Sequence, residues 1–385
     1  MYYLKLILRN ALRHKLRTAL TTLGIVIAVL AFGLLRTVVD AWYAGADAAS
    51  NTRLITRNAI SLVFPLPVTY VERTRRVPGV KGISFANWFG GVYISERNFF
   101  PQFAVDADSY FDLYPEFMLE PAELKAFKRD RKGCIVGRKL AATYGWKVGD
   151  AVPLRGTIFP GTWEFVIRGI YRGREKSTDE AQFFFQWDYL NETMKQVAPR
   201  RANQIGIMFV RIDDPAQAPS ITQEIDRTFR NSLAETLTET EKAFQLGFVS
   251  MTEGIVIMIR IVSFLVIAII MAVMANTMAM SARERHAEYA TLKAIGFGPA
   301  FVRRLILGES LLIALAGGAL GCALTFPVAH AFVERMGTLF PVFNVSTETM
   351  AMQMTAALVV GLVAALVPSV RASRMRIIDG LRAVG

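Results

Sequence analysis

Four long apolar runs constrain the fold of this chain more than any other feature of its sequence. They extend over Thr18 to Leu35, Ile261 to Ala282, Leu305 to Phe332 and Met350 to Val370. A helix rises about 1.5 Å per residue and the hydrocarbon core of a bilayer is about 30 Å thick, so each run can cross a membrane as a helix. The sequence therefore predicts four transmembrane helices.

The positions of the basic residues predict how these helices are oriented. Lys and Arg gather before the first run, between the second and the third, and after the fourth, whereas the loop between the third and fourth runs carries only Arg335. Cytoplasmic segments are the ones enriched in Lys and Arg. We therefore expect a multi-pass protein of the inner (cytoplasmic) membrane with both termini in the cytoplasm.

The N-terminal run has an alternative interpretation as a cleaved signal peptide. A basic start, an apolar run and the small residues Ala44, Ala46 and Ala48 fit that pattern. The run of 18 residues is longer than the apolar region of a usual signal peptide, which favours a retained helix.

Between the first two runs lies a long stretch that has the composition of a water-soluble domain. Residues 43–250 contain 27 Lys and Arg against 24 Asp and Glu, and long domains cross a membrane largely regardless of charge. The whole chain is 53% apolar and 20% charged, as expected for a protein that is part membrane and part soluble.

Short apolar segments punctuated by Gly and Pro predict a mixed α/β domain in this stretch. Helices are expected over Val68 to Arg76 and Ala216 to Arg230, and a polar helix over Thr238 to Glu253 leads back to the membrane. The predicted strands are Ile60 to Phe64, Gly82 to Phe85, Phe103 to Val105, Cys134 to Val136, Phe165 to Ile170 and Ile205 to Val210.

The predicted fold class is an α+β membrane protein with four transmembrane helices and a large extracytoplasmic α/β domain. Within that domain, we expect one layer from about 55–115 and 200–232, and an inserted β-rich lobe from about 120–198. The full division is a cytoplasmic amphipathic segment 1–17, the first span and its stalk 18–42, the external domain 43–250, a second stalk and span 251–282, a cytoplasmic segment 283–304, the third span 305–332, an outer loop 333–349, the fourth span 350–370 and a cytoplasmic tail 371–385.

The cytoplasmic segment after the second span has the pattern of a short amphipathic helix. Its first turn is charged, and Tyr289, Leu292 and Ile295 recur every three residues before Gly296, a helix stop. An apolar stripe of this kind can pack into a groove on a partner protein. The alternative is a solvated loop that follows the positive-inside rule, which explains the arginines but not the stripe.

The same segment, Met280 to Phe297, closely resembles the region between the second and third spans of FtsX/MacB-type ABC transporter permeases. Glu309-Ser310-Leu311 and the ending Val367 to Arg374 with Leu381-Arg382 are also similar to that family. So are Val136-Gly137-Arg138 and Val148-Gly149-Asp150 in the external domain.

The resemblance implies a MacB-like periplasmic core domain, a dimer with a second permease copy or paralogue, and a dimeric cytoplasmic ABC ATPase as partner. A periplasmic adaptor protein and membrane lipids are further expected partners. It also implies mechanotransmission, in which ATP-driven closure of the ATPase moves the stalks and external domains. The residues expected to couple to the ATPase are Arg283, Glu284, Arg285, Glu288, Tyr289, Leu292, Lys293, Ile295 and Gly296.

Two departures from the family pattern qualify the resemblance. The chain has no G-x-x-x-x-G-K-[ST] motif and no Gly-Lys pair, so the ATPase is expected on a separate polypeptide, as in the split-subunit members. The proline usual after the final basic stretch is replaced by Ile377-Ile378-Asp379.

Polar and small residues inside the third span suggest contacts between helices. A carboxylate at membrane depth is costly, so Glu309 is interpreted either as a latch to the partner permease or to the preceding segment, or as a side chain reaching the headgroups. Gly317 and Gly321 form a small-residue face that allows close approach, either at a dimer seam or against helices of the same chain.

The residues needed for catalysis or cofactor binding do not occur in recognisable patterns. His14, His286 and His330 are scattered, and the two cysteines, Cys134 and Cys322, lie in different regions, so we predict no metal site, no cofactor and no enzymatic activity. The basic residues form no single patch, which argues against nucleic acid. Phe183-Phe184-Phe185 is favoured as strand core over a site for a hydrophobic ligand.

These observations favour a permease subunit that exports or extracts a hydrophobic or amphipathic substrate, such as a lipid, a lipopeptide or an antimicrobial compound. The alternative is a transmembrane signal transducer that regulates a cell-wall hydrolase. An external domain of about 200 residues is larger than a docking loop for a hydrolase needs, which favours export.

Overall fold

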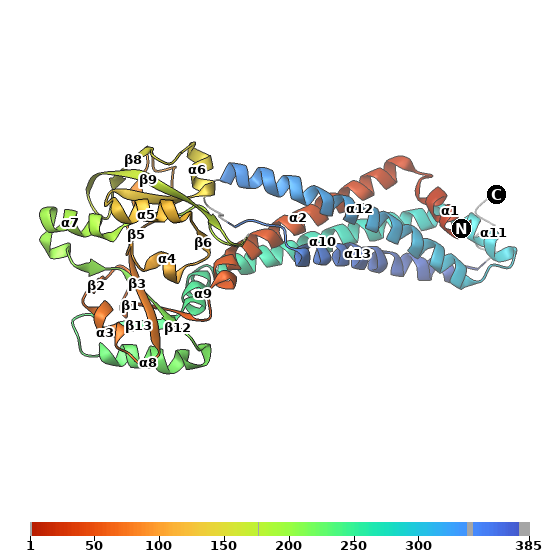
Figure 1. The fold of residues 1–385 in the computed structure, drawn as a ribbon. Helices are drawn as coiled ribbons and strands as arrows, with labels where there is room; N and C mark the ends of the chain where they lie inside the picture. Colours follow the sequence, from red (N-terminus) through yellow and green to blue (C-terminus); the bar gives the residue numbers. More distant parts are fainter. Residues whose placement is uncertain (1, 176, 337–341, 377–385) are drawn as a thin grey trace. The chain divides into compact units, whose positions relative to one another are not determined.

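The structure is a computed structural model that describes residues 2–175, 177–336 and 342–376 (Figure 1). It consists of two compact units. One, here called the membrane unit, contains residues 2–41, 252–335 and 343–376, and the other, the α/β domain, contains the described residues of 42–251 together with 336 and 342. Two sequence features lie outside the described residues. They are the departure from the family pattern at Ile377-Ile378-Asp379 and the motif Leu381-Arg382.

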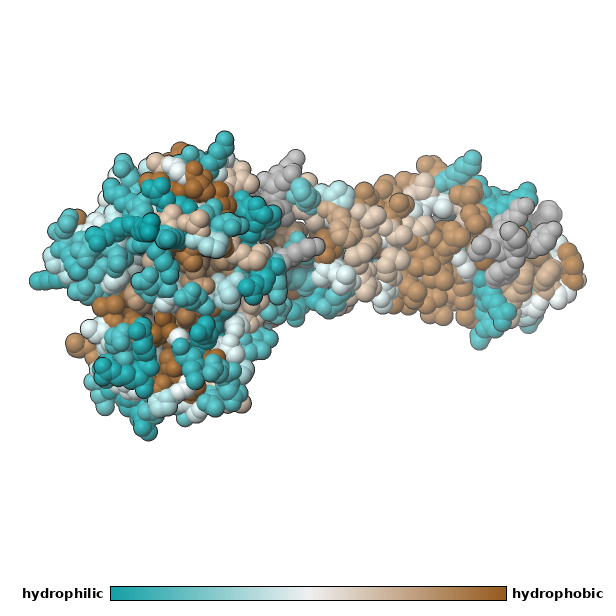
Figure 2. Space-filling model, in the orientation of Figure 1, coloured by the Kyte–Doolittle hydropathy of each residue, from teal (hydrophilic) through white to brown (hydrophobic). Residues whose placement is uncertain are grey.

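The membrane unit is built from helices that run roughly along one another (Figure 1). Four of them are long and apolar enough to cross a membrane, which confirms the prediction of four such helices. Figure 2 shows that the sides of this bundle are mainly hydrophobic. The helices are α1 (Tyr2–Ala11), α2 (Lys15–Ala48), α10 (Glu253–Glu284), α11 (His286–Ala294), α12 (Pro299–Met336) and α13 (Thr347–Arg374), of which α2, α10, α12 and α13 are the candidate spans.

A buried amide fixes how α2, α12 and α13 pack in the interior of the bundle. The side chain of Gln353 on α13 is fully buried, and its Nε2 donates hydrogen bonds to the Val29 carbonyl at 2.9 Å and to Thr325 Oγ1 at 2.8 Å. Gly33 makes room for this amide, because a Cβ atom there would lie 1.9 Å from Nε2. Polar contacts of this kind hold helices together in a bilayer, where apolar surface gives little preference for a neighbouring helix over lipid.

One large mixed sheet forms the centre of the α/β domain, with eleven strands among the described residues. The strand order is β13-β1-β12-β3-β5-β10-β7-β9-β8-β4, with β6 paired to β9, and β2 pairs with β11 separately. The pairs β10–β5 and β7–β9 are parallel, and the other pairs are antiparallel. The strands are β1 (Arg53–Asn58), β2 (Leu66–Pro67), β3 (Val80–Trp88), β4 (Gly91–Val92), β5 (Gln102–Val105), β6 (Phe117–Met118), β7 (Gly133–Gly137), β8 (Ala151–Gly156), β9 (Gly161–Gly173), β10 (Phe183–Gln186), β11 (Gln204–Ile205), β12 (Ile207–Ile212) and β13 (Thr236–Thr240).

Helices cover the sheet and close its core. Phe183, Phe184 and Phe185 of β10 are fully buried, which confirms their interpretation as strand core. Since side chains alternate along a strand, Phe184 packs in one hydrophobic cluster and its two neighbours pack in another. The helices are α3 (Tyr70–Arg75), α4 (Tyr110–Leu113), α5 (Pro121–Arg129), α6 (Arg138–Tyr144), α7 (Trp187–Val197), α8 (Ala218–Thr228) and α9 (Glu241–Met251).

Two sequence predictions in the α/β domain are wrong. Ile60 to Phe64, predicted as a strand, is an irregular segment in which Ile60 and Val63 are 82% and 86% exposed, because β1 ends at Asn58. The helix predicted to begin at Thr238 begins at Glu241, since Thr236–Thr240 pairs with β1 as β13. The region predicted as an inserted β-rich lobe, from about 120–198, contributes β7 to β10 to the same sheet as the rest of the domain.

Candidate coupling site in the membrane unit

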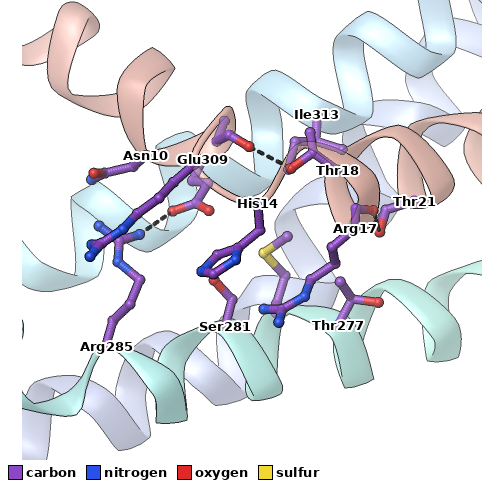
Figure 3. Close-up of a pocket in the computed structure, with 13 residues that line it drawn as sticks. Asn10, His14, Arg17, Thr18, Thr21, Thr277, Ser281, Arg285, Glu309 and Ile313 are labelled. Atoms are coloured by element: carbon purple, nitrogen blue, oxygen red, sulfur yellow. Dashed lines mark hydrogen bonds and ion pairs between the residues drawn. The ribbon is translucent and has the colours of Figure 1, made fainter.

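A buried ion pair connects the start of α11 to α12. The Nη1 atom of Arg285, which lies between α10 and α11, is 2.8 Å from Oε2 of Glu309 (Figure 3). The Nε atom of Arg285 is also 3.1 Å from Oε2 of Glu288. Arg285 and Glu309 are only 5% and 7% exposed. Of the alternatives for Glu309, this geometry corresponds to a latch onto the segment that precedes its helix.

Two further arginines, Arg13 in the turn between α1 and α2 and Arg17 at the start of α2, connect to the same region. Arg17 forms a bidentate pair with Glu284, with N–O distances of 2.6 and 2.7 Å, and His14 Nε2 lies 3.8 Å from the same carboxylate. Arg13 pairs with Glu288. Figure 3 shows His14, Arg17, Arg285 and Glu309 projecting toward a common space between the helices. A bidentate guanidinium–carboxylate pair fixes orientation as well as distance.

A lysine near the end of α11 completes the set of connections. Lys293 Nζ donates to the backbone carbonyls of Ser373 at 2.6 Å and Met375 at 2.8 Å, at the end of α13. Through Arg285, Glu284, Glu288 and Lys293, the segment around α11 is therefore bonded to elements that include α2, α12 and α13.

Electrostatics favours the charged forms of Arg285 and Glu288 in this network. Burial disfavours the charged form of Arg285, but Tyr289, Glu309 and Glu288 outweigh this and raise its pKa. Burial likewise opposes ionisation of Glu288, but hydrogen bonds from Arg13 and Arg285 lower its pKa below the ordinary value. Burial alone lowers the pKa of Lys293. Around Arg285 and Glu288, the network compensates for the cost of removing charges from water.

The predicted apolar stripe on α11 does not lie on one face. Tyr289 is 1% exposed and packs inside the membrane unit in a cluster with Ile7, Val302 and Leu305, whereas Ile295 is 71% exposed. Each residue turns a helix by about 100°, so a spacing of three drifts around the axis, and residues six apart point about 120° from each other. Tyr289 is therefore not available to a partner in this structure.

An exposed apolar surface lies just beyond α11, at a position that the three-residue spacing of Tyr289, Leu292 and Ile295 does not include. Phe297 is 42% exposed, and its ring lies 4.6 Å from that of Phe301 at the start of α12. Gly296 has φ +106° and ends the helix. The backbone N–H groups of Gly296 and Phe297 donate hydrogen bonds to the carbonyls of Lys293 and Leu292, respectively. The sequence signal is an aromatic residue directly after the glycine stop, a position that often carries an apolar contact.

Gly317 and Gly321 of α12 pack against α2 of the same chain. A Cβ on Gly317 would lie 2.8 Å from the side chain of Ile25, and one on Gly321 would lie 2.9 Å from the Val26 carbonyl. This corresponds to the alternative in which the small-residue face packs within the chain, and these positions are covered rather than free for a second copy.

Among residues 2–175, 177–336 and 342–376, no three His, Cys, Asp or Glu side chains come close enough to hold a metal ion.

Family models match both units of the chain. The model of the FtsX-like permease C-terminal region matches residues 260–377, and that of the MacB-like periplasmic core domain matches residues 18–228, more than half of the chain. The chain belongs to the FtsX/MacB-type ABC transporter permeases. This confirms the family predicted from the sequence.

Two relatives that match over nearly their whole length are described as ABC transporter permeases. This FtsX/MacB-type permease is 21% identical to the uncharacterized ABC transporter permease MJ1507 of Methanocaldococcus jannaschii, over 97% of this chain and 96% of that one. It is 23% identical to the uncharacterized ABC transporter permease YvrN of Bacillus subtilis, over 99% of both chains.

Similar solved structures cover about half of the permease. One is the extracellular domain of the ABC-type transporter YknZ from Gram-positive bacteria, with a TM-score of 0.35, 13% identity, and coverage of 49% of this chain and all of that one. Another is a domain of a permease protein from Porphyromonas gingivalis, with a TM-score of 0.33, 15% identity, and coverage of 49% and 88%. The family assignment rests on the sequence models, because these scores are too low to support an argument from the fold.

Proposed function

We propose that this permease couples ATP hydrolysis by a separate ATPase to movement of its α/β domain outside the cytoplasm, and thereby exports or extracts a hydrophobic or amphipathic substrate. In this proposal both termini and α11 are cytoplasmic, and the permease acts with a second copy or a paralogue. The observation that carries it is the set of ion pairs that bonds the α11 segment to other elements of the membrane unit.

The ATPase contact is assigned to the exposed segment at the end of α11. Ile295 and Phe297 present apolar surface there, next to Gly296 and Gly298, whose added Cβ atoms would meet nothing within 4 Å. Apolar side chains on a short protruding segment are suited to a groove on another protein. A displacement of this segment would act on α2 through Arg17 and on α12 through Arg285, because bidentate and buried pairs resist separation.

Within the α/β domain, a second buried cluster joins the points where the chain enters and leaves. Glu241, the first residue of α9, accepts hydrogen bonds from the Ser50 amide and from Arg53 Nε, both at 2.8 Å. Arg53 also pairs with Glu116 at 2.6 Å and lies 4.1 Å from the ring centre of Tyr114. This cluster allows the two ends of the domain to move together.

The proposed substrate class is supported by the family resemblance and by exposed apolar side chains of the α/β domain. Ile60, Val63 and Phe64 are 82%, 86% and 50% exposed in one short segment. Such a surface suits a lipid, a lipopeptide or another amphipathic compound better than a polar solute.

The test is to co-express the tagged permease with each ABC ATPase of its own genome and to measure which one co-purifies and hydrolyses ATP. We expect one ATPase to co-elute and to be lost with Ile295→Asp plus Phe297→Asp. The matched control is Val197→Asp plus Leu233→Asp, which places the same charges at exposed apolar sites of the α/β domain. Equal binding by both double variants would refute the assigned contact, and no bound ATPase with the wild type would refute the proposal.

A further inference from the structure

We propose that a groove between α10 and α13 binds the headgroup of an anionic phospholipid, with an acyl chain lying along its apolar wall. The inference goes beyond the proposed function and does not depend on ATPase coupling. It requires only that the helices cross a membrane.

The groove is a large, half-open cavity at the end of the bundle that carries α11. Its volume is about 520 Å³, and its lining comes from the last turns of α10, the start of α11 and the last turns of α13. The apolar part of the wall includes Ala279, Val367 and Pro368. Val367 is 58% exposed and its neighbour Leu366 is 50% exposed, so the apolar wall continues onto a lipid-facing surface.

The polar part of the groove is formed by cationic side chains. Arg283, Arg371 and Arg374 line it together with His286, and no carboxylate contributes to the lining. Other arginines in this region, Arg17 and Arg285, are paired with glutamates. By contrast, the three groove arginines form no ion pair with any residue that the structure describes.

This combination matches one ligand chemistry. Three guanidiniums recognise phosphate oxygens through charge and directed hydrogen bonds. A free phosphate ion would make no favourable contact with the apolar wall beside them, whereas the first methylenes of an acyl chain can pack against it. Basic pockets between transmembrane helices at the membrane surface are suited to anionic lipid headgroups, whereas a zwitterionic lipid carries a compensating cation that would meet the arginines.

The experiment uses the full-length permease purified in detergent. Native mass spectrometry and lipid titration compare phosphatidylglycerol with phosphatidylcholine of identical acyl chains, and inorganic phosphate is added as a soluble competitor. We expect the wild type to retain phosphatidylglycerol preferentially, and phosphate at concentrations equimolar with the lipid not to displace it.

Variants separate the groove from general surface charge. Arg283→Gln, Arg371→Gln and Arg374→Gln together should weaken phosphatidylglycerol binding at least about tenfold, because each basic residue near an anionic lipid contributes roughly fivefold to affinity. The matched control changes Arg9, Arg303 and Arg304 to Gln, which removes three exposed charges from the membrane unit outside the groove, and should bind like the wild type. Ala279→Trp keeps every charge and fills the apolar wall, and should also lose the lipid.

Several outcomes would overturn the proposal. They are equal retention of the two lipids by the wild type, equal loss with both triple variants, and unchanged binding with Ala279→Trp. Displacement of the lipid by equimolar phosphate would show a simple anion site. If the glutamine triple variant does not fold, the triple Arg→Lys variant and Ala279→Trp test the site instead. The Arg→Lys variant should still prefer phosphatidylglycerol, but with reduced affinity. Unchanged lipid binding in either variant would refute the site.

Discussion

The guanidinium of Arg285 and the carboxylate of Glu309, 24 positions apart in the sequence, form a 2.8 Å ion pair that is nearly inaccessible to solvent. Each charge is buried only because the other is present. The pair bonds the beginning of α11 to α12, and its removal should therefore affect both stability and coupling.

Glu309→Gln should lower the thermal stability of the permease. Removing one partner of a buried pair costs about 3 kcal/mol, because Arg285 would stay buried with only the partly exposed Glu288 as its counter-charge. The double variant Arg285→Met plus Glu309→Leu should recover most of that loss, since no buried charge remains. Thermal unfolding in detergent measures both. Glu348→Gln, which removes an exposed carboxylate paired with Arg36 at 3.6 Å, is the control and should cost less than about 1 kcal/mol. A double variant less stable than Glu309→Gln would contradict this account.

Glu288 should make a stabilising contribution that depends on pH in one direction. Burial opposes its ionisation, but hydrogen bonds from Arg13 and Arg285 lower its folded-state pKa below the ordinary 4.5. A lowered pKa stabilises the fold above the unfolded-state pKa, and this stabilisation disappears as the pH falls through the folded-state pKa. The stability difference between wild type and Glu288→Gln should thus be constant from pH 7 to about pH 5 and shrink below pH 4.5. A difference that grows on acidification would show that the carboxylate is not stabilised by these arginines.

Gly33→Ala should destabilise the helix bundle through its clash with Gln353. The new Cβ would lie 1.9 Å from Gln353 Nε2, and overpacking of this kind costs about 1–3 kcal/mol. Gly254→Ala is the matched control, because nothing lies within 4 Å of its added methyl group. In a double-mutant cycle, Gly33→Ala should cost little in a Gln353→Ala background. Additive losses would mean that the two positions do not interact.

Arg53→Met should loosen the α/β domain where the chain enters and leaves it. Glu241 would remain buried without its cation, and the expected loss is about 3 kcal/mol. Hydrogen exchange should increase around Ser50 and at the start of α9. Arg57→Met removes a half-buried pair with Glu239 on the adjacent strands and should cost about 1 kcal/mol or less. Equal losses of stability with the two substitutions would show that the Arg53 cluster contributes no more than the pair of Arg57 and Glu239.

The sequence was sufficient for features that depend on local composition. Four helices were predictable because about 20 consecutive apolar residues have few alternatives to a membrane. The strand character of Phe183 to Phe185 followed from aromatic residues in a short buried run. The family was recognisable because the segment from Met280 to Phe297 is contiguous.

Features set by distant contacts were not predictable. Glu309 was recognised as unusual, but its partner Arg285 could not be chosen among the neighbouring arginines without the packing of α11. The three-residue spacing predicts one apolar face that contains both Tyr289 and Ile295. A spacing of three follows one face of a helix over about one turn only, so the two side chains point in different directions. Ile60 to Phe64 has the composition of a strand, yet the sheet pairs the preceding residues instead.

The contact between Gly33 and Gln353 also has a consequence for how sequences of such permeases can diverge. The amide occupies the space that any side chain at position 33 would need, so neither position can change freely while the other is kept. Relatives that keep this helix arrangement should therefore substitute the two positions as a pair, with a larger residue at one matched by a smaller residue at the other. Such paired substitution would record the contact in alignments of the family.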